Sequence, residues 1–198
     1  MKKYIKWIIC LISLIIFLIL VYFVKTNKEI IIDSIVYNFI SKLINNNLTY
    51  IVKFITFLGS AFTVITITII CLIVLKNKKI GLFMSIDLIL ITILQHTIKP
   101  LVGRVRPSIL PLVEETSHSF PSGHSLTAMA FYGFIIYLIY NSNLKYKKVY
   151  IILLGLLILL IGISRVYLGV HYITDVIGGF TFSLFYLTLF ISLIKKFI

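Results

Sequence analysis

The sequence predicts an all-α membrane protein with six transmembrane helices and an additional amphipathic helix at the outer membrane surface. Composition gives the first reason: 60% of the 198 residues are hydrophobic, and the mean hydropathy of +1.10 exceeds what a soluble core of this size needs. Spacing gives the second reason, because apolar runs of about 20 residues, long enough to cross a bilayer as helices, recur along the chain. We therefore expect residues 1–198 to form one integral membrane domain.

The six apolar runs predict helices with these bounds: Ile5 to Val24, Ile51 to Leu75, Ile80 to Ile98, Ser125 to Tyr140, Val149 to Ser164 and Val176 to Ile194. Lys2, Lys3 and Lys6 precede the first run, as in a signal peptide, but that run is long and no cleavage site of small residues follows it. Cys10 and Cys71 lie inside predicted spans, so we expect neither a disulfide framework nor a thiolate metal site.

The segment from Glu29 to Ile44 places polar residues at three- and four-residue spacings among apolar ones, which predicts an amphipathic helix. Its composition is typical of a helix that lies in the membrane interface, and the run Asn45 to Asn47 is expected to end it before the second span.

Lysine clusters predict the orientation of the chain. They lie at the N-terminus, after the second and fourth spans, and at the C-terminus, at the following positions: Lys2, Lys3, Lys6, Lys76, Lys78, Lys79, Lys145, Lys147, Lys148, Lys195 and Lys196. In a six-span protein these places share one side, which the positive-inside rule makes cytoplasmic. The net charge of +13 is therefore explained by topology and contact with anionic lipid, and we expect no nucleic-acid partner.

Two outer loops contain most of the side chains that could bind a substrate or react with it. The first extends from Lys99 to His124 and the second from Arg165 to Asp175, and together they contain three of the four histidines and all of the arginines. Both loops are expected at the extracytoplasmic end of the bundle, so we expect the functional site there.

The first loop begins with KPLVGRVRP and ends with PSGH. Lys99 and Arg106 are seven residues apart, close to two helical turns, although Pro100 and Gly103 argue against a continuous helix between them. The Ser-Gly turn before His124 leads into a predicted helix N-terminus, whose free N–H groups favour an anion.

The second loop contributes Arg165, His171 and Asp175. His171 and Asp175 are four apart, so a helical turn would let the carboxylate hold one ring nitrogen. With Lys99 and Arg106 the loops supply three permanent cations, an anion-binding turn, two histidines and a carboxylate. This set suits a phosphoryl group, because guanidinium groups bind its oxygens in a bidentate geometry.

The three segments, Lys99 with Arg106-Pro107, Pro121 to His124, and Ser164-Arg165 with His171 and Asp175, resemble the three signature motifs of the type 2 phosphatidic acid phosphatase superfamily. With the six spans, the resemblance covers nearly the whole chain. Among subfamilies the chain is most similar to small bacterial enzymes that dephosphorylate phosphatidylglycerophosphate or undecaprenyl diphosphate. The resemblance implies a metal-independent lipid phosphatase without a cofactor, acting on an anionic phospholipid, phosphatidic acid included, or on a polyprenyl diphosphate.

The resemblance also implies roles for individual residues. His171 would attack phosphorus to form a phosphohistidine, and Asp175 would fix its tautomer and stabilise the imidazolium. His124 would protonate the leaving oxygen and then activate water. The groups expected to bind the phosphate are Lys99, Arg106, Ser122, the Gly123 N–H and Arg165.

Other polar residues have simpler explanations. Arg104 lies outside the motifs and is expected to be an interfacial anchor. Asp87, inside the third span, is expected to make structural hydrogen bonds, and His96 to be a packing or interface residue. Glu114, Glu115 and His118 could contact the substrate headgroup, but solvation of the loop is the default explanation.

Three alternative functions are considered. A protein that binds or transports an anionic lipid without hydrolysis could use the same basic pocket, although binding alone would not need His171 paired with Asp175. A zinc site of His124, His171 and Asp175 would be revealed by sensitivity to a chelator. Haloperoxidase chemistry with vanadate is disfavoured by the membrane spans.

Overall fold

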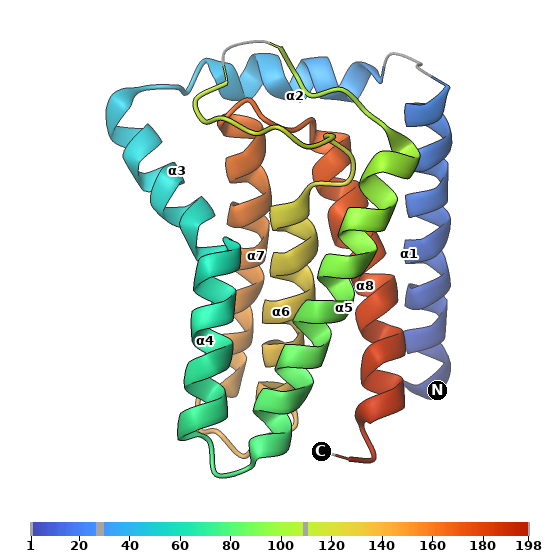
Figure 1. Cartoon of the computed structure of the whole chain (residues 1–198), viewed down its shortest axis with the longest axis vertical. Helices are drawn as coiled ribbons and strands as arrows, with labels where there is room; N and C mark the ends of the chain where they lie inside the picture. Colours follow the sequence, from blue (N-terminus) through green and yellow to red (C-terminus); the bar gives the residue numbers. More distant parts are fainter. Residues whose placement is uncertain (1, 27–29, 109–110, 198) are drawn as a thin grey trace.

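The computed structural model describes residues 2–26, 30–108 and 111–197. Every regular element in this part of the chain is an α-helix, and their bounds are α1 (Lys2–Lys25), α2 (Ile31–Ser41), α3 (Asn46–Leu58), α4 (Ala61–Val74), α5 (Lys78–Val102), α6 (Gly123–Tyr140), α7 (Lys147–Tyr167) and α8 (Ile173–Ile194). Figure 1 shows α1 and α4 to α8 running along the long axis of the molecule, while α2 lies across one end. The predicted all-α membrane fold is confirmed.

Within the described ranges, α1, α5, α6, α7 and α8 are each long and apolar enough to cross a membrane. The bent pair α3 and α4 makes a sixth span if the two are taken together. The amphipathic segment forms α2, although its first predicted residue, Glu29, lies outside the described residues. The helix α2 ends at Ser41, before the asparagine run that was expected to end it. The run instead starts α3, because the side chain of Asn45 caps that helix by accepting a hydrogen bond from the Leu48 N–H at 2.9 Å.

The second span differs from the prediction of one helix from Ile51 to Leu75. It is broken at Gly59 and Ser60, and the two halves are inclined by 46°. Ser60 starts the second half as its cap, with the side chain accepting from the Thr63 N–H. Gly59 lies against α7, where a Cβ atom would be 2.6 Å from the side chain of Ile161. The break therefore follows from a cap residue and a close helix contact inside an otherwise apolar run.

Helix α6 lies at the centre of the bundle and contacts α5, α7 and α8. Its Phe131 and Phe134 have no exposed surface, and Phe134 packs edge-on against Phe190 of α8 with ring centroids 5.7 Å apart. The outer helices have the opposite pattern, because large apolar side chains of α1 such as Leu11 and Leu18 are more than half exposed. An apolar outer surface is what contact with lipid requires.

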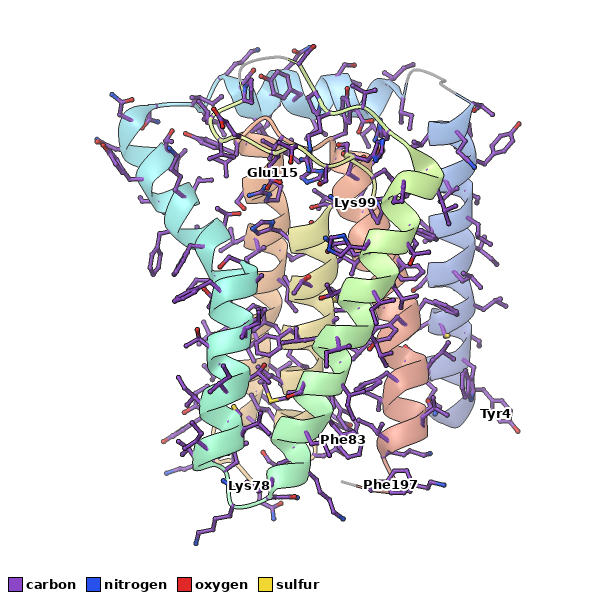
Figure 2. The ribbon with its side chains drawn as sticks, viewed as in Figure 1. Tyr4, Lys78, Phe83, Lys99, Glu115 and Phe197 are labelled. Atoms are coloured by element: carbon purple, nitrogen blue, oxygen red, sulfur yellow. The ribbon has the colours of Figure 1, made fainter. Side chains whose placement is uncertain are left out.

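The two chain ends lie at the same end of the bundle, and α2 with the loop after α5 covers the opposite end (Figure 1). The α4–α5 and α6–α7 connections are at the end that holds the termini, so all four lysine clusters gather there. Figure 2 shows Lys78 at that end, and Lys99 and Glu115 at the other. The basic end of the molecule is thus separated from the predicted site by the length of the spans.

Asp87 lies in α5, and its side chain is fully buried. The Tyr186 hydroxyl donates to the Asp87 backbone carbonyl at 3.2 Å. Neither carboxyl oxygen of Asp87 has a hydrogen-bond partner among the described residues. The expected side-chain hydrogen bonding is therefore absent from the described part of the structure, although the residue itself is tied to α8.

Candidate active site

The end of α5 positions Lys99. The helix continues through Pro100 to Val102, contrary to the expectation of an interruption, and ends where Gly103 adopts a left-handed conformation with φ of 70°. Pro100 cannot donate a backbone hydrogen bond to the carbonyl four residues earlier, but the helix continues past it for two residues. Lys99 is 6% exposed, and its Nζ donates to Ser117 Oγ and to the His118 carbonyl, both at 2.9 Å. The loop after α5 thus folds back over the helix end.

Arg106 joins the two outer loops. Its Nε donates to the Ser117 carbonyl at 2.7 Å, and its Nη1 donates to the Val170 carbonyl at 2.8 Å. The same Nη1 lies 3.1 Å from Nε2 of His171. Since a guanidinium can only donate, Nε2 of His171 accepts, and the ring proton of the neutral imidazole is then on Nδ1.

The predicted pairing of His171 with Asp175 is present, with 3.3 Å between Nδ1 and Oδ2. Asp175 lies in the first turn of α8 with no exposed surface, and His171 lies just before that helix. The same Oδ2 accepts from the Tyr172 N–H at 2.9 Å and from Ser119 Oγ at 2.5 Å. Four donors, counting Arg104 on Oδ1, therefore fix the orientation of this carboxylate.

The environment of His171 favours its neutral form. Burial lowers the pKa of His171 to about 4, and the positive charges of Arg106 and Arg165 act in the same direction, while Asp175 opposes them. At neutral pH the ring is uncharged, and the lone pair of Nε2 is on the side that faces Arg106.

The PSGH turn forms the start of α6. Ser122 caps the helix: it is fully buried, and its hydroxyl accepts from Ser125 Oγ at 2.9 Å. The Ser122 N–H donates to the Asp175 carbonyl at 3.0 Å, which ties the turn to α8. This close approach requires Gly179, where a Cβ atom would be 2.9 Å from the Ser122 carbonyl oxygen.

Arg165, on α7, is 2% exposed, and its Nη1 donates to Thr56 Oγ1 at 2.9 Å. Its Nη2 pairs with Glu115 Oε1, and Glu115 Oε2 lies 3.5 Å from Nη2 of Arg106. The Nε of Arg165 is buried without a partner among the described residues. Glu115 is exposed like Glu114 and His118, as expected for a solvated loop, but its carboxylate also pairs with the two arginines.

The prediction for Arg104 is also corrected. Its side chain is 14% exposed and forms ion pairs with Asp175 at 2.5 Å and with Asp33 at 2.7 Å. It is therefore part of the support of Asp175 and not an anchor in the interface. Sequence spacing gave no signal for this contact, since Arg104 is 71 residues from both partners.

A cavity of about 240 Å³ lies between α4, α5 and α6, beneath the first outer loop. Its polar end is lined by Gln95, His96, Lys99, Arg106, Glu115, Ser117, Gly123, His124 and His171, and its apolar end includes Val64, Ile65 and Leu88. The predicted residues Ser122 and Arg165 adjoin this cavity through Gly123 and Glu115 without lining it. Among the described residues, no group of three His, Cys, Asp or Glu side chains is placed to hold a metal ion.

Residues 80–198 match the model of the PAP2 superfamily. The chain belongs to this superfamily. All the predicted site residues lie inside the matched range, while α1 to α4 lie outside it. The predicted family is thereby confirmed.

Known PAP2 proteins resemble the chain in sequence. It is 47% identical over 95 residues to phosphatidylglycerophosphatase B of Bacillus subtilis, a match that covers 46% of this chain and 47% of that protein. It is 31% identical over 192 residues to undecaprenyl-diphosphatase of Sulfolobus acidocaldarius, covering 90% of this chain and 86% of that protein. These relatives confirm the prediction of a phosphatase.

Two solved structures resemble the chain in fold. The crystal structure of a transmembrane PAP2-type phosphatidylglycerolphosphate phosphatase from Bacillus subtilis matches with a TM-score of 0.87 and 33% identity, over 96% of this chain and 97% of that one. Aquifex aeolicus LpxE matches with a TM-score of 0.67 at 23% identity, over 85% of this chain and 97% of that one, which shows the fold alone. The match over nearly the whole chain supports a multi-pass membrane protein with a PAP2 fold.

Proposed function

We propose that this PAP2 protein, acting as one membrane domain, releases phosphate from a lipid phosphomonoester or diphosphate through a phosphohistidine formed on His171. The observation that carries the proposal is the arrangement of His171. Its Nδ1 faces Asp175, and its Nε2 faces Arg106 at 3.1 Å, on the wall of a cavity that also contains Lys99 and His124. A neutral imidazole held by a carboxylate beside fixed cations is suited to attack on phosphorus.

The steps follow from the positions of these groups. The Nε2 lone pair of His171 forms the N–P bond while the P–O bond to the lipid breaks, and Asp175 stabilises the resulting positive ring. His124, at the start of α6, donates its proton to the leaving oxygen. Water then attacks phosphorus and gives its proton to His124, the N–P bond breaks, and inorganic phosphate leaves with His171 neutral again.

The charge of the site matches that of a phosphoryl group. Lys99, Arg106 and Arg165 are cations, and Glu115 is the carboxylate paired with two of them, which leaves an excess of two positive charges. A phosphate monoester carries about −1.5 to −2 charges at neutral pH. The Nε of Arg165, which has no partner among the described residues, is a donor that a phosphoryl oxygen could use.

A lipid substrate is supported by the apolar end of the cavity. Ile65 of α4 lines the cavity and is 51% exposed, which supports an opening at this apolar end. A headgroup can thus reach the cations while its chain stays in hydrocarbon, which avoids a cost of about 0.8 kcal/mol for each methylene extracted. The lysine clusters at the opposite end support a site on the extracytoplasmic side, with both termini in the cytoplasm.

The two relatives suggest two headgroups, phosphatidylglycerophosphate and undecaprenyl diphosphate, with phosphatidic acid as a third to be tested. We would purify the protein in detergent with EDTA present and measure phosphate release from all three lipids, and the relative rates then rank the substrates. The parent is expected to release phosphate and to form a phosphoenzyme that survives a basic quench.

A His171→Ala variant is expected to do neither. His118→Ala serves as the matched control, because the His118 side chain is exposed and the hydrogen bond that this residue accepts from Lys99 uses its backbone carbonyl. A folded parent that binds these lipids without releasing phosphate would favour the carrier hypothesis. Activity found only in a parallel preparation without EDTA would favour a metal.

A further inference from the structure

We propose that Asp33, on the surface helix α2, and Arg104 are positioning residues that act on His171 through Asp175. The three charged groups form a chain in which the guanidinium of Arg104 joins two carboxylates. This inference rests on the proposed function, in which His171 is the nucleophile. Asp33 lies outside the residues that match the PAP2 model. The row of three charged groups therefore links the surface helix α2 to the site in the matched region.

Arg104 is held on every side. Nη1 donates to Asp175 Oδ1 at 2.5 Å and to Thr174 Oγ1 at 2.7 Å, and Nη2 donates to Asp33 Oδ2 at 2.7 Å. The guanidinium also lies over the ring of Tyr172, 4.0 Å from its centroid. The orientation of its planar fork is therefore determined by Asp33 on one side and Asp175 on the other.

Asp33 is 6% exposed although it belongs to an amphipathic helix at the end of the bundle. Its Oδ1 accepts from the Thr174 N–H at 3.0 Å, in the first turn of α8, and from Thr174 Oγ1 at 2.9 Å. A carboxylate at a helix N-terminus is favoured by the free N–H groups and by the helix dipole. Asp33 therefore fixes α2 to the same helix turn that carries Asp175.

The two oxygens of Asp175 have separate partners. Oδ2 faces Nδ1 of His171, Ser119 and the Tyr172 N–H, and Oδ1 faces Arg104. Arg104 thus prevents rotation of the carboxylate and offsets its negative charge. Without Asp33 the fork loses one of its two carboxylate partners, so the orientation of Arg104 is less restricted, although its contacts with Asp175, Thr174 and Tyr172 remain.

The test compares four variants with the parent: Asp33→Asn, Arg104→Gln, the double variant and Arg104→Lys. Ser34→Ala is the matched control on α2, because Ser34 is exposed and its hydroxyl contacts only its own helix, at the Ile31 carbonyl. Phosphate release from the best lipid substrate gives kcat and KM over a range of pH, and thermal unfolding in detergent reports whether each variant is folded.

We expect Arg104→Gln to lower kcat on the order of 10²-fold, the cost of a small misplacement of a reacting group. We expect Asp33→Asn to lower kcat roughly tenfold, equivalent to about 1.4 kcal/mol, with KM changed less than twofold in both. If Asp33 acts through Arg104, the double variant is no slower than Arg104→Gln alone. Arg104→Lys should be intermediate, since it keeps the charge but reaches one carboxylate.

A second readout separates positioning from a general structural defect. The charged or titratable groups that face His171 are Asp175, Arg106, Arg165 and His124. Removing the Arg104 charge leaves Asp175 uncompensated, which favours the imidazolium form of His171. The acid limb of kcat/KM should therefore move to higher pH in Arg104→Gln, whereas a general defect lowers activity equally at all pH values.

Three results would overturn the inference: parent-level kcat in Asp33→Asn, additive losses in the double variant, or an unmoved acid limb in Arg104→Gln. If Asp33→Asn and Arg104→Gln do not elute as folded protein, Arg104→Lys decides: parent-level kcat refutes the inference, and a reduced kcat at unchanged KM supports it. An inactive parent would instead refute the proposed function, so the two failures are distinguishable.

Discussion

Replacing Asp175 with Asn tests the proposed tautomer of His171. In the parent, Asp175 Oδ1 accepts from Arg104 and Oδ2 faces Nδ1 of His171. An Asn amide has one oxygen and one NH₂ group, and the NH₂ group cannot face the guanidinium, because both are donors. At the Oδ2 position the NH₂ group would also meet a donor, the Tyr172 N–H, which is 2.9 Å from that oxygen in the parent. Because the guanidinium is charged, it forms the stronger hydrogen bond to the amide oxygen, so the NH₂ group is expected to face His171.

This orientation changes which nitrogen of the His171 ring carries the proton. An NH₂ donor facing Nδ1 moves the ring proton to Nε2, which then opposes the Arg106 donor at 3.1 Å and has no lone pair for phosphorus. We expect kcat to fall by about 10³- to 10⁴-fold, as expected for a catalytic histidine held in the wrong tautomer. That loss is equivalent to about 4 to 5.5 kcal/mol in the barrier.

The measurement is phosphate release in detergent beside an Asp175→Ala variant, with thermal unfolding as the check on folding. Alanine removes the orienting group without forcing the wrong tautomer, so it should retain more activity than Asn. If Asn is as active as Ala or more active, the tautomer argument is refuted. An unfolded Asn variant would show instead that the buried charge network is needed first for stability.

Two further predictions concern pH and packing. Because burial lowers the pKa of His171 to about 4, its neutral form persists down to that pH, so the acid limb of kcat/KM that reports protonation of this ring should lie near pH 4. An acid limb near pH 6.5 would contradict the burial argument. Gly179→Ala places a Cβ atom 2.9 Å from the Ser122 carbonyl oxygen and 3.1 Å from the Leu126 N, both backbone atoms, and should lower the free energy of unfolding by about 1–3 kcal/mol and reduce activity. Gly155→Ala, with nothing within 4 Å, is the matched control. It should leave activity unchanged and should not lower the free energy of unfolding, because alanine favours a helix more than glycine does.

The sequence by itself determined the membrane class, the positions of the spans and the two loops that form the site. Hydropathy and lysine distribution depend on the local chain, so they are visible without a structure. The contact between His171 and Asp175 was predictable for the same reason, since four residues separate them along one turn. The family resemblance added the roles of residues that spacing alone could not assign.

Tertiary structure decided the ion pairs of Arg104, Glu115 and Asp33. Arg104 was expected to anchor the chain in the interface, yet it is held inward by ion pairs with residues distant in sequence. Glu115 is exposed as expected, but its pairing with Arg165, 50 residues away, was not predicted. Asp33 was expected on the polar face of a surface helix and instead caps the start of α8. The bend at Gly59 likewise depends on how closely α3 approaches α7. A buried charge is stable only beside its partner, and which partner it meets depends on how helices pack, which local periodicity does not determine.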